Sequence, residues 1–259
     1  SLSFAARLEV WMSAMLNLSP LLLLGRSERR SMLTLCRRQS RAVDYGAWSH
    51  AHVLRTLNRL RLDASESICV IGDGLGTMAG LLACQTEREP RRIYSVNLTE
   101  VLLVEYVMLR RMGFNQEHFK LLSEPADPAD LAAQPSPTFY LVPAQHQNLL
   151  NSKQVDLFIN IDSFQEMSPR ALGDYFSLIR KQRCVLYCCN LESKTLRDGT
   201  KNDFQNYPWG AGRYRLDGSP RWRKLQVRLL PTFGRHRAPV GIFRIPHLHR
   251  AISYGNNQH

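Results

Sequence analysis

Five short apolar runs alternate with amphipathic stretches between residues 68 and 189, and this alternation constrains the fold more than any other feature of the chain. The runs cover residues 68–71, 93–96, 139–142, 155–161 and 185–189. Runs of this length suit buried parallel strands. The stretches between them carry helix signals such as Ser168-Pro169, a capping hydroxyl followed by proline. The pattern predicts an α/β fold in which helices cover both faces of a mostly parallel sheet.

The rest of the chain flanks this region. Residues 1–62 are predicted to form a helical segment whose Arg-rich middle is either a solvated helix face or an anion-facing lid. Residues 63–250 are predicted to form the ligand-binding domain, and residues 251–259 a tail. Within the domain, residues 190–220 read as loop. Residues 224–230 and 240–245 should form a hairpin, because the connection between them is too short for a crossover helix.

The net charge and the cysteine content limit which partners and which cellular compartment suit the chain. The 259 residues carry a formal net charge of +12, which attracts phosphates, carboxylates, nucleic acid or anionic lipid without choosing among them. None of the six cysteines stands in a CxxC pair, so we expect a reduced, cytoplasmic chain with structural thiols and no zinc site. No apolar run, residues 21–24 included, approaches the roughly 20 residues of a membrane span, so no span is expected.

A glycine-rich loop follows the first predicted strand. Its sequence is Gly72-Asp73-Gly74-Leu75-Gly76-Thr77-Met78-Ala79. Glycines let a backbone turn tightly and approach a ligand closely, which favours a nucleotide-like cofactor. The loop can be aligned with two different motifs. As G-x-G-x-G it suits S-adenosylmethionine, and as G-x-G-x-x-A it matches the dinucleotide-binding pattern.

Polar residues follow two further strands, at the edge of the sheet where open α/β folds bind ligands. Asn97 ends the second strand, where an acidic residue would grip ribose hydroxyls. Asn160, Asp162 and Ser163 end the fourth strand, and Glu166 follows on the next turn. We expect this last group to converge on the side of the glycine loop.

Several of these motifs, in this order, resemble the sugar O-methyltransferases of the class I, S-adenosylmethionine-dependent fold. They are ICVIGDGLGTMAGLL, IYSVNLTEVLLVEYVMLRRMG, FINIDSFQEMSPRALGDYFSLIR, CNLESK and NYPW, and they span roughly residues 65–215. The resemblance implies a seven-stranded, mostly parallel sheet with a terminal antiparallel hairpin. It makes residues 63–250 an S-adenosylmethionine-binding methyltransferase domain. In that family the second strand commonly ends in an acidic residue, and Asn97 departs from this pattern.

The resemblance also assigns a cofactor site. Around the methionine and ribose it places Gly72, Asp73, Gly74 and Gly76. Near the ribose and adenine it places Asn97, Leu98, Ala144 and Gln145. Beside the methyl donor it places Asn160, Asp162 and Ser163.

Methylation of a sugar hydroxyl needs a group that removes its proton. Asp162 and Glu166 are the candidates, with Glu166 preferred because it lies further out; paired carboxylates would equally suit a divalent metal that acidifies the hydroxyl. Lys194 and Arg197 would bind an anionic group of the acceptor, and Tyr207 and Trp209 offer flat faces on which a sugar can stack.

Other functions remain open on the sequence alone. The positive charge favours a nucleic-acid-binding or RNA-modifying protein, although no RNA-binding module is visible. The dinucleotide-binding pattern allows a nicotinamide oxidoreductase. Asn97 allows a methyltransferase-like fold without activity. The histidines of HLHR, residues 247–250, read as a basic strand end at the surface rather than as a metal pair.

Overall fold

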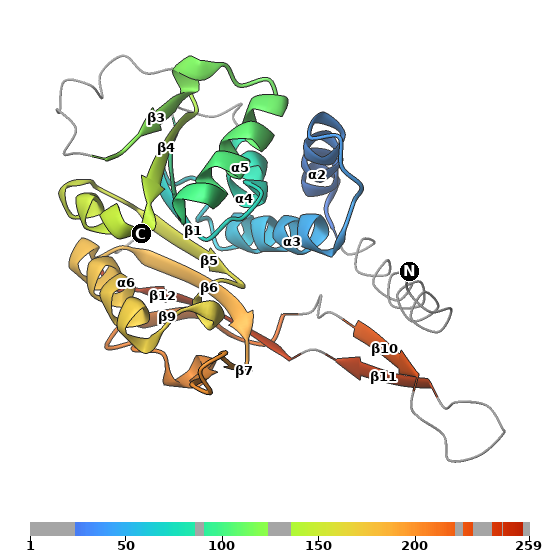
Figure 1. Ribbon diagram of the computed structural model, residues 1–259, viewed down its shortest axis with the longest axis vertical. Coiled ribbons are helices and arrows are strands. Elements are labelled where there is room, and N and C mark those ends of the chain that lie inside the picture. Colours follow the sequence, from blue (N-terminus) through green and yellow to red (C-terminus); the bar gives the residue numbers. More distant parts are fainter. Residues whose placement is uncertain are drawn as a thin grey trace.

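The structure is a computed structural model that describes residues 24–85, 91–123, 136–220, 225–229, 240–244 and 246–255. Its centre is an eight-stranded sheet with the order β3-β4-β2-β1-β5-β6-β12-β9 (Figure 1). The strands are β1 Ser67–Ile71, β2 Arg92–Asn97, β3 Phe119–Leu121, β4 Thr138–Pro143, β5 Leu157–Ile161, β6 Val185–Leu191, β9 Arg213–Gly218 and β12 His247–Ser253.

The sheet confirms the predicted fold class. From β3 to β6 every neighbouring pair is parallel, whereas β12 runs antiparallel to both β6 and β9. The count is eight strands rather than seven, because the short β3 adds an edge that the sequence did not predict. The strand order reverses direction between β1 and β5, and such a switch point is where open α/β sheets bind ligands.

Successive side chains along each strand pack alternately into two hydrophobic cores, one on each face of the sheet. Ile68 and Val70 of β1 face a core shared with the helices α2 Arg26–Arg38, α3 Tyr45–Arg59, α4 Thr77–Ala83 and α5 Thr99–Arg111. Cys69 and Ile71 face the other core, which contains α6 Pro169–Gln182 and the 3₁₀ segment η4 Ala144–Ser152. The Ser168 hydroxyl accepts the Ala171 N–H at 3.3 Å, which confirms the predicted helix start.

The N-terminal helical segment belongs to the first core. Residues 1–23 lie outside the described residues, so only the second part of the predicted segment can be placed. There Leu35 of α2 and Trp48 and Leu54 of α3 are buried against α4. The two helices therefore form a layer of the domain on the side of the glycine loop (Figure 1).

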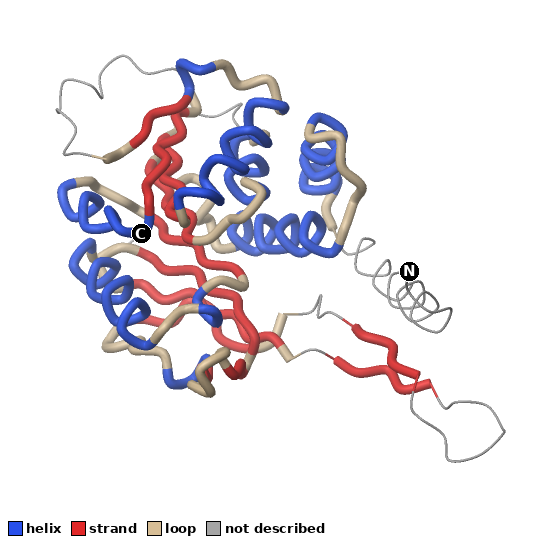
Figure 2. The backbone as a smooth tube through the Cα atoms, in the orientation of Figure 1, coloured by secondary structure: helices blue, strands red, loops and turns tan. Residues whose placement is uncertain are grey.

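The C-terminal region differs from expectation. The predicted hairpin exists as β10 Leu225–Leu229 and β11 Val240–Arg244, but these strands pair only with each other and stand apart from the main sheet (Figures 1 and 2). The antiparallel strand inside the sheet is β12, which continues past the predicted boundary at residue 250. Residues 190–220, read as loop, contain β9 and a small sheet of β7 Ser193–Thr195 and β8 Lys201–Asp203.

The described part of the chain holds no helix with the length and apolar content needed to cross a bilayer. All six cysteines are free, and all except Cys84 are buried.

Candidate functional site

The glycine loop links β1 to α4 with three left-handed glycines. Gly72, Gly74 and Gly76 have φ values of +76°, +64° and +67°. A Cβ on Gly72 would lie 2.1 Å from the Ser163 Oγ, and one on Gly76 would lie 2.9 Å from the Glu105 Cγ. A Cβ on Gly74 would meet no described atom within 4 Å. Packing therefore explains two of the glycines, and the third borders open space.

The side chain of Asp73 is committed to α4. Its two carboxylate oxygens accept the N–H groups of Met78 and Ala79, each at 2.7 Å. Burial raises the pKa of Asp73, while the nearby His50, whose Nε2 lies 3.9 Å away, and the two backbone bonds act in the opposite direction. Contact with a ligand at this position would have to come from the backbone.

Glu105 lies beneath the loop, and sequence reasoning missed it. The side chain is fully buried on α5. Burial, and then the charge of Asp73, raise the pKa of Glu105 well above its usual value. Burial therefore favours the neutral form of this carboxyl group, which packs under Gly76.

The ends of β2 and β4 meet at the same edge of the sheet. The Asn97 Oδ1 accepts the Leu98 N–H at 3.0 Å, while the Asn97 Nδ2 is buried without a hydrogen-bond partner among the described residues. Leu98 is 60% exposed, and the Gln145 Nε2 donates to the Thr99 Oγ1 at 3.4 Å. Ala144 precedes Gln145 directly at the end of β4. The structure thus brings together the residues assigned to the adenosine end.

At the end of β5, Asn160 is a fully satisfied structural residue. Its Nδ2 donates to the Ile71 carbonyl at 3.0 Å and to the Ser163 Oγ at 2.8 Å. Its Oδ1 accepts from the Phe164 N–H at 3.1 Å and from the Asn190 Nδ2 at 2.8 Å. This buried network holds the ends of β1, β5 and β6 together, so Asn160 supports the site from below.

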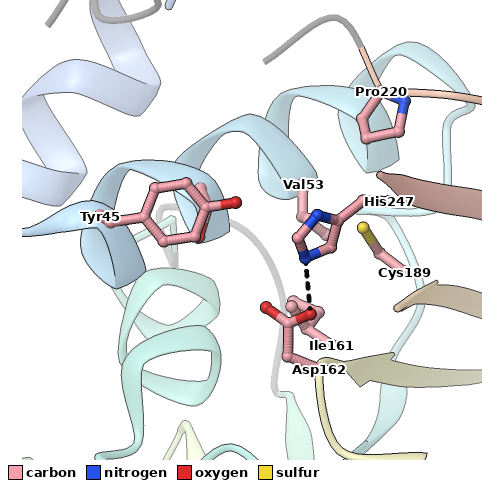
Figure 3. A pocket seen from close by; sticks show the side chains of 8 residues that line it. Tyr45, Val53, Ile161, Asp162, Cys189, Pro220 and His247 are labelled. Atoms are coloured by element: carbon pink, nitrogen blue, oxygen red, sulfur yellow. Dashed lines mark hydrogen bonds and ion pairs between the residues drawn. The ribbon is translucent and has the colours of Figure 1, made fainter. Parts of the chain in front are cut away.

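Asp162 faces a small pocket. Its Oδ1 lies 3.1 Å from the Nε2 of His247, the first residue of β12 (Figure 3). Its backbone is left-handed, with φ of +57°, and its N–H donates to the Cys189 carbonyl at 2.9 Å. The pocket is lined by Tyr45, Ser49, Val53, Ile161, Asp162, Cys189, Pro220 and His247.

His247 was placed at the surface by the sequence reading, and the structure corrects this. Its side chain is only 7% exposed. His249 is also buried, with its Nδ1 3.2 Å from the Tyr187 hydroxyl, and burial lowers its pKa to about 4. No apolar run marks β12 in the sequence, so nothing signalled that these histidines enter the sheet.

Glu166 is engaged with another candidate residue. It forms an ion pair with Lys194 of β7, and their side chains are 52% and 32% exposed respectively. Arg197 is exposed in the turn between β7 and β8. None of these three residues lines the Asp162 pocket.

The two aromatic candidates are part of the core beside α6. Tyr207 and Trp209 are buried, and the Trp209 Nε1 donates to the Phe204 carbonyl at 2.9 Å. The Arg250 guanidinium lies 4.5 Å from the centre of the Trp209 ring. Protein atoms cover both rings, so neither offers an open face for a sugar.

A metal centre receives no support. Among the described residues, no three His, Cys, Asp or Glu side chains are grouped closely enough to hold an ion.

The sequence matches no protein-family model and no curated protein. Solved structures do resemble the chain. A protein from Thermoplasma acidophilum is 13% identical and covers 89% of this chain and 98% of its own, with a TM-score of 0.52. A protein from Pyrococcus horikoshii, described as a candidate RNA methyltransferase, is 13% identical and covers 90% and 99%, with a TM-score of 0.51.

An O-methyltransferase from Bacillus cereus in complex with SAH is 13% identical and covers 94% and 99%, with a TM-score of 0.48. At such identities the likeness shows the fold alone. The chain has the Rossmann-like α/β fold of class I methyltransferases. None of the three proteins is described as acting on a sugar.

Proposed function

We propose that the protein is an S-adenosylmethionine-dependent methyltransferase. The observation that carries this proposal is the pairing of an open glycine loop with an unsatisfied donor on the neighbouring strand. Gly74 borders open space, and the Asn97 Nδ2 is buried without a partner among the described residues. The Asn97 Nδ2 is one of several buried polar atoms without a partner among the described residues, and its position beside the glycine loop makes it available to a ligand that accepts its hydrogen.

The residues at this edge suit each part of the cofactor. The Asn97 amide can donate to a ribose hydroxyl, and the exposed Leu98 side chain offers an apolar face to the adenine. The backbone from Gly72 to Gly76 approaches the methionine portion, because no side chain intervenes at Gly74. When bound, the cofactor supplies an electrophilic methyl group on a positively charged sulfur.

We propose further that the acceptor is a sugar hydroxyl, which enters at the pocket beside Asp162. The carboxyl ends of β5 and β6 border this pocket, on the same edge of the sheet as the glycine loop. Displacement at carbon needs the acceptor oxygen in line with the methyl group, and it needs a base for the hydroxyl proton. Asp162 and Glu166 are the carboxylates at this edge. The sequence resemblance supports a sugar as the acceptor. The exposed Arg197 would attract an acceptor that carries a negative charge.

A second candidate is methylation of RNA, in which the sugar hydroxyl is a ribose hydroxyl. From residue 218 to 259 the chain has no Asp or Glu and eight Arg or Lys residues. Such one-sided charge favours a polyanionic partner. RNA binding would weaken steeply as salt concentration rises, whereas binding of a neutral glycan would not.

Calorimetric titration with S-adenosylhomocysteine and with NAD tests the cofactor. We expect S-adenosylhomocysteine to bind and NAD not to bind. The proposal is wrong if NAD binds and S-adenosylhomocysteine does not. Transfer of labelled methyl groups to nucleotide sugars, neutral oligosaccharides and oligoribonucleotides then tests the acceptor, and binding of S-adenosylhomocysteine without transfer to any of them would contradict the proposed sugar acceptor.

A further inference from the structure

The carboxylate of Asp162 is held by a residue from the last strand of the sheet. We propose that Asp162 is the general base of methyl transfer and that His247 is its positioning residue; this inference rests on the proposed function. The His247 Nε2 lies 3.1 Å from the Asp162 Oδ1. Asp162 is 38% exposed and His247 only 7%, so the carboxylate can meet an acceptor while the imidazole lies behind it.

The backbone fixes Asp162 as firmly as the side-chain bond does. Its φ of +57° is a conformation that residues with side chains rarely adopt, although aspartate tolerates it better than most. The Asp162 N–H donates to the Cys189 carbonyl of β6 at 2.9 Å. Strained conformations persist where the surrounding structure holds them, and they cluster at functional sites. Two strands, β6 and β12, thus hold this one residue from different sides.

The surroundings of the pair suit a hydroxyl acceptor. Figure 3 shows the Tyr45 side chain pointing from α3 toward Asp162 and His247. Burial raises the pKa of Tyr45, and the charge of Asp162 raises it further, so the phenol stays neutral and can donate or accept a hydrogen bond. Ser49 adds a hydroxyl to the same wall, and Val53 and Ile161 supply apolar surface. The pocket is about the size of one water molecule, so it can take a single hydroxyl group of an acceptor whose remaining atoms lie outside it.

Glu166 is less suited to the role, although its outward position favoured it in the sequence. Its carboxylate is paired with Lys194, is more exposed than that of Asp162, and does not line the pocket. Glu166 and Lys194 are therefore expected to contact the part of the acceptor that lies outside the pocket, rather than to take its proton.

The chemical step would need the sulfonium methyl group of the cofactor, the acceptor hydroxyl and the Asp162 carboxylate. The acceptor oxygen forms a bond to the methyl carbon as the carbon–sulfur bond breaks and its electron pair stays on sulfur. The proton of the hydroxyl passes to the Asp162 carboxylate. Through its Nε2 hydrogen bond, His247 keeps the Oδ1 of that carboxylate in place, so that the Oδ2 is presented to the acceptor. Asp162 then returns the proton to solvent.

The experiment compares four variants with the wild-type protein. Asp162→Asn removes the base and keeps a side chain that tolerates the left-handed backbone. His247→Gln keeps a donor near the Nε2 position, and His247→Leu removes it. Asp174→Asn is the matched control, since Asp174 is exposed on α6 and lies away from the pocket. Each protein is titrated with S-adenosylhomocysteine, assayed for methyl transfer to the three acceptor classes named above, and crystallised.

We expect both His247 variants and Asp174→Asn to bind S-adenosylhomocysteine within about threefold of the wild-type affinity, which would show that the cofactor site is intact; Asp162→Asn is assayed at saturating cofactor. Asp162→Asn should lower kcat by about 100-fold or more, in line with loss of a general base. His247→Leu should lower kcat by about 10- to 100-fold with little change in the acceptor KM, because misplacement of a reacting group costs rate. His247→Gln should recover most of that loss. In the crystals, the Asp162 carboxylate should keep its place in the Gln variant and leave it in the Leu variant.

Failure of the wild type to bind S-adenosylhomocysteine would overturn the proposed function itself. Other results overturn only the inference. These are equal kcat in the Leu and Gln variants, an unmoved carboxylate in the Leu crystal, or no loss of kcat in Asp162→Asn. Cofactor binding by the wild type without transfer to any acceptor would overturn the proposed sugar acceptor and this inference together.

Discussion

Substitution of Gly74 can distinguish an effect on folding from an effect on ligand binding. The backbone of Gly74 is left-handed, but no described atom would touch an added Cβ. An alanine there would carry a Cβ at φ of +64° with no described atom within 4 Å. The left-handed conformation costs a residue with a side chain about 1–2 kcal/mol, and the stiffer unfolded chain returns about 0.4–1 kcal/mol. We therefore expect Gly74→Ala to lower the free energy of unfolding by about 1 kcal/mol.

Cofactor binding should suffer far more. A methyl group in the open space at Gly74 would occupy the volume that the cofactor needs, so Gly74→Ala should weaken binding of S-adenosylhomocysteine at least tenfold, which corresponds to about 1.4 kcal/mol. The larger, branched side chain of Gly74→Val should abolish binding. Calorimetry measures the affinity, and urea denaturation measures the stability.

Two other glycines serve as controls. Gly113, after α5, has φ of +99°, and a Cβ added there would likewise meet no described atom within 4 Å, so Gly113→Ala should cost similar stability and no affinity. Gly72→Ala should cost more stability than either, because its Cβ would lie 2.1 Å from the Ser163 Oγ. If Gly74→Ala binds S-adenosylhomocysteine as well as Gly113→Ala does, the cofactor does not lie against this loop.

Three further predictions test neighbouring parts of the argument. Asn97→Asp should tighten binding of S-adenosylhomocysteine several-fold in calorimetry, because a carboxylate accepts charge-assisted bonds from ribose hydroxyls; unchanged affinity would place the ribose elsewhere. Burial lowers the pKa of His249 from 6.5 to about 4, so the unfolded chain takes up a proton first, and wild-type stability should fall as pH decreases from 6.5 to about 4. Denaturation of His249→Gln across that range should show a smaller fall. Trp209→Ala should lower the free energy of unfolding by about 3–5 kcal/mol while leaving affinity for S-adenosylhomocysteine intact, since Trp209 packs in the core; loss of affinity at normal stability would argue against a purely structural role.

The central part of the fold was predictable because its strands are apolar on both faces. The five predicted runs correspond to β1, β2, β4, β5 and β6. Such runs are typical of parallel strands covered on both sides, so local sequence was enough to find them. The glycine loop was equally visible, because a left-handed backbone needs glycine.

β12 escaped the sequence reading because its polar residues find partners only in the folded state. Arg250 pairs with Asp217 of β9 at 2.9 Å and stacks on the Trp209 ring. His249 meets the Tyr187 hydroxyl of β6. Each partner is distant in sequence, so the segment reads as a basic surface although it is a buried strand. The roles proposed for Trp209 and Tyr207 failed for the related reason that an aromatic side chain looks the same in sequence whether its face is open or covered.

The candidate site also has one half formed by residues close together in sequence and one half formed by residues far apart in sequence. The half assigned to the cofactor is built from β1, β2, β4 and β5 and from the turns that follow them, where each side chain lies close to its own strand in sequence. The half assigned to the acceptor depends on the bond between Asp162 and His247, which are 85 positions apart. His247 reaches the pocket only when β12 is inserted between β6 and β9. The proposed cofactor site could thus be predicted from local motifs, whereas the proposed positioning residue comes from the last strand in the sequence and becomes visible only in the fold.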